Sequence, residues 1–271
     1  DEYNYCSHPI PKQGNWIGEE KEYFYLPAIN NSWIGGNYNS NLAYTKEEIK
    51  IPMDNWLKFI GLWLSEGSFD NENIAQSHGY RVFITQKKHC EKVEAVLNNL
   101  PFNYQKEGIN YIICNKQLWN YIKQFGHSYD KFLPHEFKLL PKEQLQILFN
   151  YLMIGDGSIR KIPSKHGKHQ MTYYTSSKKL ADDIQEIVIK LGYIANINKR
   201  NRGVINIEGR THKTKDCYEV RIDQGMHYYI KPNHINRKHY VGKVYCCEIT
   251  NNTIMVRRNG YATWCGNSIG V

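Results

Sequence analysis

The sequence predicts a mixed α+β protein that is built from two similar halves. Two apolar segments, 59–67 and 149–157, have helical periodicity, and each ends in a single acidic residue followed by glycine. These glycines are 90 positions apart (157 − 67), and the next helices repeat their apolar faces at 91 positions, as Val93 and Ile184 show (184 − 93). Strand-like stretches lie between the helices of each half. Two similar halves in one chain predict pseudo-twofold symmetry.

The first half is predicted to begin with a strand and a long helix. Residues 23–26 alternate as a strand does, and the helix spans Ile51 to Gly67. Pro52 suits a first helical turn, and Asp54 places negative charge near the N-terminus. The elements expected after this helix are strands at 74–76 and 80–85, a helix at 88–100, and strands near Tyr104 and at 111–114.

The second half is predicted to repeat this order. A helix is expected at about 142–157, a strand at 173–174 and a helix at 179–191. A basic hairpin over Asn196–Lys215 then continues into an alternating strand at 218–222. The expected domains are a connector at 1–50, a duplicated domain at 51–235 with halves at about 51–140 and 141–235, and a C-terminal segment at 240–267.

Composition excludes several classes of protein. The chain has 271 residues, 41% of them hydrophobic, and a net charge of +9, which predicts a globular fold rather than disorder. It has no run of about 18 apolar residues, so we expect no membrane span. The seven cysteines form no Cys-x-x-Cys pair, which argues against a disulfide framework or a zinc site and favours a reducing compartment, the cytoplasm. The positive charge suits a polyanionic partner but does not decide for one.

The two acidic helix ends are the main candidates for chemistry. A helix that is apolar all round must be buried, and the C-terminal end of a helix already carries partial negative charge. Glu66 and Asp156 therefore lie where a positive charge is needed. A single acid of this kind is more simply explained as a solvated loop residue. Two acids at matching positions of a duplicated basic protein favour ligands of a divalent cation.

These segments and their surroundings resemble the LAGLIDADG (dodecapeptide) motifs of homing endonucleases. The resemblance implies a duplicated αββαββα fold with pseudo-twofold symmetry, in which the two motif helices pack together between the halves. It assigns metal binding and catalysis to Glu66 and Asp156. The departures from the family pattern are Leu64 and Ile154 in place of its first acid, and Tyr151 in place of a glycine that allows close helix approach.

The implied activity is site-specific cleavage of double-stranded DNA by metal-dependent hydrolysis. Divalent ions held by carboxylates can activate a water and stabilise a leaving oxygen, and Mg²⁺ is expected because the ligands are oxygens. The resemblance also implies a lysine near each acid. The candidates at the strand ends are Gln86, Lys87 and Lys88 in the first half and Ser177, Lys178 and Lys179 in the second. Lys87 and Lys178 are our predicted catalytic lysines, although a solvated helix start explains these residues equally well.

A DNA-contacting surface is predicted on both halves. A two-stranded ribbon fits the major groove, where Arg, Asn and Gln read base edges and Lys contacts phosphates. The candidate residues are Gln76, Arg81 and Gln86 in the first half and Lys199, Arg200, Arg202, Arg210, Lys213 and Lys215 in the second. Taken in isolation, the basic hairpin is equally well explained as an exposed hairpin that charge keeps soluble.

The C-terminal segment carries a second motif. Short strand-like stretches between 244 and 265 end in Gly266-Asn267-Ser268. An asparagine amide can attack its own backbone carbonyl and break the chain, and the next hydroxyl can accept an acyl group. Alone, such a triplet is typical of a turn. In this order after a LAGLIDADG segment, however, residues 243–268 resemble the C-terminal blocks of inteins, with remnant strands of a Hint splicing domain.

That second resemblance implies catalytic roles for three residues. Asn267 is the cyclising residue, Ser268 is the nucleophile that starts the C-extein (residues 268–271), and Cys246 holds an acid–base or nucleophilic position. Gly266 replaces the usual penultimate histidine. The chain starts at Asp1, and nothing before Ile51 resembles the N-terminal splicing blocks. We therefore expect a monomeric piece of a longer intein that does not splice alone.

The expected partners are double-stranded DNA, the N-terminal intein half and the exteins. One alternative is a catalytically silent DNA-binding module of the same fold, and retention of Glu66 and Asp156 favours the enzyme. A third interpretation is an unrelated basic enzyme that ends in Asn-Ser by chance, and it would have to explain both sets of motifs in this order.

Overall fold

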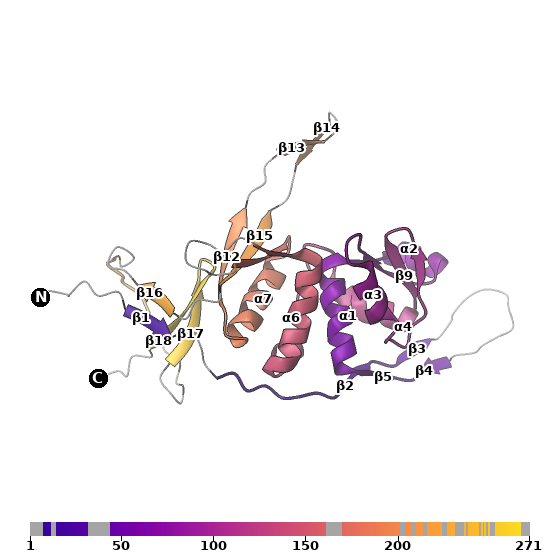
Figure 1. Ribbon diagram of the computed structural model, residues 1–271, viewed down its shortest axis with the longest axis horizontal. Coiled ribbons are helices and arrows are strands. Elements are labelled where there is room, and N and C mark those ends of the chain that lie inside the picture. Colours follow the sequence, from indigo (N-terminus) through magenta and orange to yellow (C-terminus); the bar gives the residue numbers. More distant parts are fainter. Residues whose placement is uncertain are drawn as a thin grey trace, which may run out of the picture.

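The computed structural model describes most of the duplicated region and parts of both ends. The described residues are 8–11, 15–31, 44–160, 170–200, 204–207, 210–213, 216–223, 227–230, 236, 238–243, 245, 247, 249 and 253–266. Helices and antiparallel sheets alternate along these residues, so the predicted mixed α+β class is confirmed (Figure 1). None of the helices in the described ranges is long and apolar enough to cross a membrane.

The first half consists of a four-stranded sheet and the helices packed against it. Its elements are α1 (Met53–Glu66), β6 (Gly67–Phe69), α2 (Glu72–His78), β7 (Arg81–Thr85), α3 (Cys90–Leu97), β8 (Gln105–Glu107), β9 (Asn110–Cys114), α4 (Lys116–Ile122), a 3₁₀ turn (Lys123–Phe125) and α5 (His135–Lys138). The strand order is β6-β7-β9-β8. Helix α1 carries Asp54 in its first turn, as expected, but Pro52 lies just before the helix, at the end of the strand Ile49–Pro52, and not in its first turn.

The second half repeats this sheet. Its elements are α6 (Lys142–Asp156), β10 (Gly157–Ile159), β11 (Gln170–Thr175), α7 (Lys178–Lys190), β12 (Ile194–Arg200) and β15 (Cys217–Asp223). The order β10-β11-β15-β12 matches β6-β7-β9-β8 strand for strand. This correspondence confirms the internal duplication that the 90- and 91-residue spacings predict. At its far edge the second sheet gains β18 (Tyr261–Gly266) and β17 (Thr253–Arg258).

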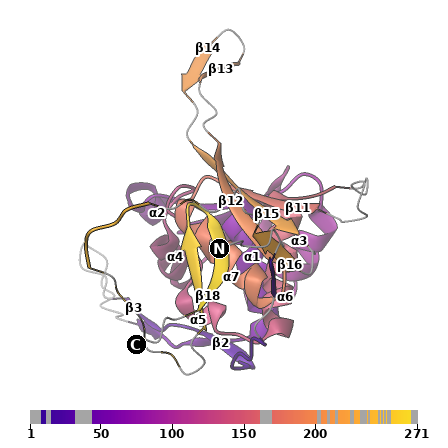
Figure 2. The ribbon, with the colours of Figure 1, turned by 90° about the vertical axis from the view of Figure 1, so that its left-hand side faces the viewer.

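Short two-stranded ribbons surround these sheets. The pairs are β2 (Tyr23–Leu26) with β5 (Ile49–Pro52), β3 (Ile29–Asn31) with β4 (Tyr44–Lys46), β1 (His8–Pro11) with β16 (His227–Ile230), and β13 (Val204–Ile207) with β14 (Arg210–Lys213). The predicted basic hairpin is present as the β12–β15 pair, which β13 and β14 extend into a ribbon that projects from the body (Figures 1 and 2).

One predicted strand is wrong. Residues 74–76 alternate over too few positions to define a strand, and they belong to helix α2. Ala75 is fully buried and its carbonyl accepts the N–H of Gly79, whose φ of 79° ends the helix in the left-handed conformation that glycine adopts readily. The turn residues on either side of the segment therefore close a short helix instead of joining two strands.

The centre of the molecule is the contact between α1 and α6, which run side by side (Figure 1). Trp56, Phe59 and Ile60 of α1 are fully buried, and so are Leu145 and Leu148 of α6. The prediction that both apolar helices are buried is confirmed for these faces. Burial of this extent, about 1.5–3 kcal/mol for each large apolar side chain, makes the interface a main source of stability.

The two helices approach closely because each contact position carries one glycine. Gly61 faces Tyr151, and a Cβ on Gly61 would lie 3.0 Å from the Tyr151 Cβ. Gly155 faces Ser65, and a Cβ on Gly155 would overlap the Ser65 side chain. The two residues of each pair are 90 positions apart (151 − 61 and 155 − 65), so they occupy equivalent positions in the two halves. Tyr151 fits because its equivalent residue, Gly61, has no side chain.

Replacing Gly155 with valine is expected to destabilise the protein by about 3 kcal/mol, because the new methyl groups must displace Ser65 and the α1 backbone. Thermal unfolding would show this as a drop in Tm of roughly 5–10 °C. The matched control is Gly266→Val, since a Cβ on Gly266 has no atom within 4 Å. An unchanged Tm for Gly155→Val would contradict the close packing of these helices.

Candidate active site

The two predicted metal-binding acids lie together at the ends of the central helices. Glu66 is the last residue of α1 and Asp156 is the last residue of α6, and both are partly buried. The adjacent Gly155 lies against the Glu66 side chain, since a Cβ on Gly155 would be 3.0 Å from the Glu66 Cγ. Helix packing thus places two carboxylates, one from each half, beside each other.

The electrostatics of the pair favour a bound cation. The pKa of Asp156 is raised to about 7, mainly by burial and also by the neighbouring Glu66 charge, while Lys131 opposes both effects. Burial also raises the pKa of Glu66, while a hydrogen bond from Gln86 and the charge of Lys131 lower it. Two partly desolvated carboxylates that repel each other are stabilised by a positive ion between them.

Lys131 supplies a positive charge at this site, and sequence reasoning missed it. Its side chain is only 4% exposed, and its Nζ donates hydrogen bonds to the carbonyls of Trp63 (2.9 Å), Leu64 (3.0 Å) and Gly67 (2.8 Å). The net pKa of Lys131 is lowered to about 8, because burial outweighs the charges of Asp156 and Glu66, which raise it. The ammonium group therefore caps the negative end of α1 and faces both acids.

Two buried polar residues hold this arrangement. The Gln86 amide donates to a Glu66 carboxylate oxygen at 3.2 Å and accepts the backbone N–H of Lys88 at 2.9 Å. Ser177 caps the N-terminus of α7 and donates its hydroxyl proton to the Lys131 carbonyl at 2.5 Å. The first residue of each predicted strand-end triplet therefore touches the site.

The predicted catalytic lysines lie elsewhere in the structure. Lys87 is exposed, and Lys178 pairs with Asp182 on the surface of α7 at 2.5 Å. The lysine whose charge acts on both carboxylates is Lys131, in the loop before α5. Its sequence context, between Asp130 and Phe132, carries no spacing signal that separates it from other lysines.

The halves are also joined by a hydroxyl bridge. The Ser65 hydroxyl lies 2.9 Å from the Tyr173 hydroxyl and donates to the Leu152 carbonyl at 3.1 Å. Tyr173 is fully buried on β11, and burial together with the nearby Asp156 charge raises its pKa well above the ordinary value. This uncharged bridge fixes the end of α1 against α6 beside the two acids.

The structure places some of the predicted DNA-binding residues and leaves others undescribed. Arg81 pairs with Asp70 at 2.7 Å, Lys199 with Asp216 at 2.6 Å, and Arg200 with Glu219 at 2.6 Å. Gln86 is buried at Glu66. The residues whose side chains lie outside the described set are Gln76, Arg202, Arg210, Lys213, Lys215, Cys246, Asn267 and Ser268.

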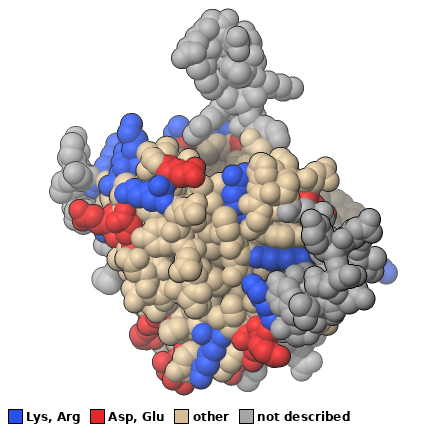
Figure 3. All heavy atoms as spheres, turned by 90° about the vertical axis from the view of Figure 1, so that its right-hand side faces the viewer, with Lys and Arg blue, Asp and Glu red and all other residues tan. Residues whose placement is uncertain are grey.

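Positive charge is not concentrated on the outer end of the first half. Figure 3 views that end, and Lys and Arg side chains there are interspersed with Asp and Glu side chains on a largely uncharged surface. Arginines gather instead around a polar hollow of about 390 Å³ on the second sheet, close to the end of α6. Its lining residues are Ser158, Arg160, Thr172, Tyr174, Arg200, Glu219 and Arg221.

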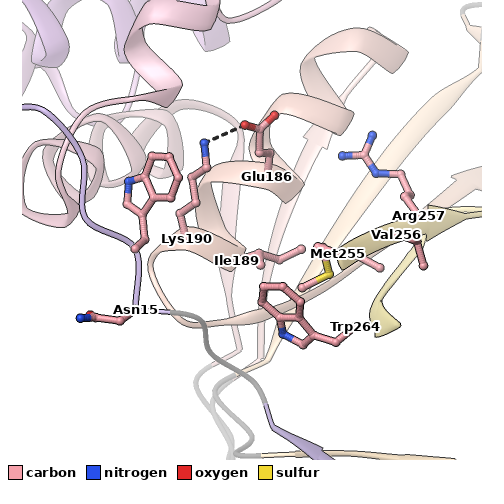
Figure 4. A pocket seen from close by; sticks show the side chains of 10 residues that line it. Asn15, Glu186, Ile189, Lys190, Met255, Val256, Arg257 and Trp264 are labelled. Carbon is pink, nitrogen blue, oxygen red and sulfur yellow. Dashed lines mark hydrogen bonds and ion pairs between the residues drawn. The ribbon is translucent and has the colours of Figure 1, made fainter. Parts of the chain in front are cut away.

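A larger cavity of about 580 Å³ has neither Glu66 nor Asp156 among its lining residues (Figure 4). It separates Trp16 and the end of α7 from the β17–β18 hairpin, and Lys190 pairs with Glu186 at its rim. The hairpin is fixed beside it by the Arg257–Asp182 ion pair, with a distance of 2.7 Å. Because the cavity contains neither candidate acid, its chemistry is separate from that of the helix ends.

The donor set at the helix ends fits a hard divalent cation. The described residues contain no cluster of three or more His, Cys, Asp or Glu side chains, so a transition-metal cage is absent from this part of the chain. Two carboxylates with raised pKa values match the ligand set of Mg²⁺, which takes one or two carboxylates and fills its remaining positions with water and phosphate oxygens.

Part of the second half matches a known protein family. Residues 143–230 match the family described as LAGLIDADG-like domain. The matched range runs from α6 through β16 and includes Asp156. This segment is therefore similar to LAGLIDADG-like domains, in agreement with the resemblance predicted from its motif.

Curated proteins share segments with the chain. It is 31% identical over 168 residues to the ATP-dependent Clp protease proteolytic subunit of Chlamydomonas moewusii, covering 59% of this chain and 16% of that protein. It is 28% identical over 306 residues to the DNA-directed RNA polymerase subunit beta C-terminal section of Stigeoclonium helveticum, covering 93% and 28%. The replicative DNA helicase DnaB of Synechocystis is 36% identical over 99 residues, covering 36% and 10%. The chain thus spans less than a third of each of these relatives.

Among solved structures, the chain resembles I-DmoI in complex with DNA and Ca. The identity is 16%, the match covers 63% of this chain and 83% of that one, and the TM-score is 0.41. A structure of mesophilic variants of the homing endonuclease I-DmoI gives a TM-score of 0.42 at 16% identity, with 63% and 88% coverage.

Proposed function

We propose that this chain is a site-specific DNA endonuclease that cuts both strands by Mg²⁺-dependent hydrolysis, and that it forms part of an intein. The observation that carries the proposal is the pairing of Glu66 and Asp156 at the ends of two packed, pseudo-symmetric helices. One acid from each half matches a duplex that presents one scissile phosphate on each strand. The similarity of residues 143–230 to LAGLIDADG-like domains supports the same activity.

The residues of the site have distinct proposed roles. Glu66 and Asp156 would hold Mg²⁺, which supplies an activated water and a counter-charge for the leaving oxygen. Gln86 orients the Glu66 carboxylate, and Ser65 with Tyr173 fixes the end of α1. Lys131 places a positive charge where the phosphate gains negative charge, and its three carbonyl partners prevent it from collapsing onto the acids.

The relatives support an inserted element. The relatives have no named activity in common: they are a protease subunit, an RNA polymerase subunit and a replicative helicase. Each relative matches this chain over only a small part of the relative's own length. A segment shared by such proteins is more simply an insertion than the source of any one named activity. The motif order at the C-terminal end, with Cys246, Asn267 and Ser268, agrees with an intein in the cytoplasm.

A cleavage assay tests the proposed endonuclease. The purified chain would be incubated with a library of double-stranded genomic fragments, with Mg²⁺ or with EDTA, and new ends would be sequenced. We expect paired cuts at one short sequence, only with Mg²⁺. Cutting that persists in EDTA would overturn the metal role. Selective binding without cutting would establish a silent DNA-binding module instead.

Splicing is tested separately. The chain alone is expected to give no ligated product, and addition of an N-terminal intein fragment is expected to release the residues after Asn267. Asn267→Ala should abolish this release, because no other side chain at that junction can cyclise through its own carbonyl. Mass spectrometry distinguishes the products. Ligation without an added fragment would contradict the proposal that the chain needs a partner half.

A further inference from the structure

The polar hollow on the second sheet contains a buried acid between two arginines. Glu219 lies on β15 with a side chain that is 3% exposed. One of its oxygens is 2.6 Å from the Arg200 Nε, and the other is 3.1 Å from a terminal nitrogen of Arg221. The arginine side chains themselves are 62% and 46% exposed. The carboxylate is thus an internal anchor for two guanidinium groups that reach into solvent.

This hollow lies on the sheet face that the helices leave uncovered. Val220 and Ile222 alternate with Glu219 and Arg221 along β15, and the apolar pair is fully buried on the side that α7 covers (Figure 1). Thr172 of β11 pairs with Arg221 in register and adds a hydroxyl to the same face. The open face of the second sheet is therefore polar and fixed in shape.

We propose that Arg200 reads guanine in the major groove of one half-site, and that Glu219, whose other oxygen binds Arg221, is the positioning residue that orients it. This inference rests on the proposed DNA endonuclease. Arg200 binds Glu219 through its Nε, and within the described ranges its two terminal nitrogens have no ion-pair partner, so they form a fork that can bind a ligand. Such a fork pairs with O6 and N7 of guanine, which is the commonest specific contact of arginine with DNA.

The buried acid argues for base reading over phosphate binding. A phosphate contact needs positive charge and little orientation, and a carboxylate beside it weakens the attraction. Base reading requires a fixed guanidinium plane, which a buried carboxylate supplies. Glu219 lowers the net positive charge of the hollow but fixes the orientation of the guanidinium groups. A fixed orientation favours base reading, whereas the lower charge disfavours phosphate binding.

The first half does not repeat this hollow. By strand register, Ile112 and Asn110 of β9 take the places of Arg221 and Glu219, and Phe83 of β7 takes the place of Thr172. Ile112 is 5% exposed, and the Asn110 side chain accepts a hydrogen bond from Thr85 at 2.8 Å. The first half therefore lacks counterparts of Glu219 and Arg221 at these positions, and its comparable pair, Arg81 with Asp70, lies at a different place on the sheet. We expect the Arg200 contact only in the half-site bound by the second sheet.

Selection of bound sequences from a random double-stranded library tests the inference. Wild type and the variants Arg200→Lys and Glu219→Gln would be compared in EDTA, which prevents metal-dependent cutting, with Arg258→Lys on β17 as the matched surface control. We expect wild type and the control to enrich guanine at fixed positions of one half-site. Arg200→Lys should lose that preference about 5- to 100-fold at one position and leave the other half-site unchanged.

Glu219→Gln gives the sharper result, because the loss of a negative charge and the loss of arginine orientation are expected to change DNA binding in different ways. Removal of a negative charge should raise affinity for unrelated DNA, whereas loss of orientation should lower the guanine preference at the same positions as Arg200→Lys. Circular dichroism checks folding, and Arg200→Lys tests the inference if Glu219→Gln unfolds. A uniform loss of affinity over all sequences would show a phosphate contact and overturn the inference. If wild type enriches no sequence, both the inference and the proposed function are wrong.

Discussion

Replacing Asp156 with asparagine is expected to lower double-strand cleavage on the order of 10³-fold or more at saturating Mg²⁺. Asparagine keeps the shape of the side chain and one carbonyl oxygen, but it removes the charge that holds the cation beside Glu66. Glu66→Gln should have an effect of the same size, because the two acids lie at matching positions of the two halves. The measurement is the rate of conversion of supercoiled plasmid carrying the selected target to the linear form.

The control for this loss is Asp54→Asn, the same substitution at an exposed acid in the first turn of α1, at the far end of the helix. It should leave the cleavage rate unchanged within about twofold. Binding of the target in EDTA should survive in both variants, since neither acid contacts DNA without the metal. Cutting at the wild-type rate by Asp156→Asn would exclude the helix ends as the active site.

The fold could be predicted from the sequence where the pattern was repeated. The two apolar helices, their acidic ends and the 90-residue spacing are local signals, and each was present twice. The orders of the strands within the two sheets come from the structure alone, and they match each other as the duplication requires. The segment at 74–76 had no second copy, and three alternating residues cannot distinguish a strand from one turn of helix.

The site could be predicted only in part, for a physical reason. Glu66 and Asp156 are recognisable because each interrupts an apolar run, whereas Lys131 acts through three backbone carbonyls at and just after the end of a helix, 64 to 68 residues earlier in the chain. Every residue has a backbone carbonyl, so the sequence does not show which residues bind Lys131. A buried lysine is therefore invisible to motif analysis until tertiary structure brings the helix end to it.

The burial of Glu219 could not be predicted from the sequence either. In the sequence it is the single acid of the predicted strand 218–222, which follows a basic segment, and nothing marks it as buried. Burial follows from the β12–β15 register, which sets Arg200 and Arg221 on the same face. Motif analysis could identify the basic residues, but only the register identifies the acid that orders them.

Asp156→Asn is also expected to stabilise the metal-free protein, by about 2–4 kcal/mol at pH 7.5. Burial and the Glu66 charge raise the pKa of Asp156 in the folded state to about 7 from 3.8. The folded protein therefore holds this proton more tightly than the unfolded chain does. Ionisation of Asp156 therefore lowers the free energy of unfolding. This loss is absent below about pH 4, grows between pH 4 and pH 7, and is constant above pH 7.

The test is thermal unfolding of wild type and Asp156→Asn at two pH values in EDTA and in Mg²⁺. In EDTA at pH 7.5 the variant should unfold roughly 5–10 °C higher than wild type, and at pH 5 its advantage should fall to less than half. Added Mg²⁺ should raise the Tm of wild type and not that of the variant, because ligand that binds only the folded state stabilises it. Asp54→Asn should follow wild type in every condition. A variant that is less stable than wild type at pH 7.5 would mean that Lys131 already compensates the acid pair, which would remove the electrostatic reason for a bound cation.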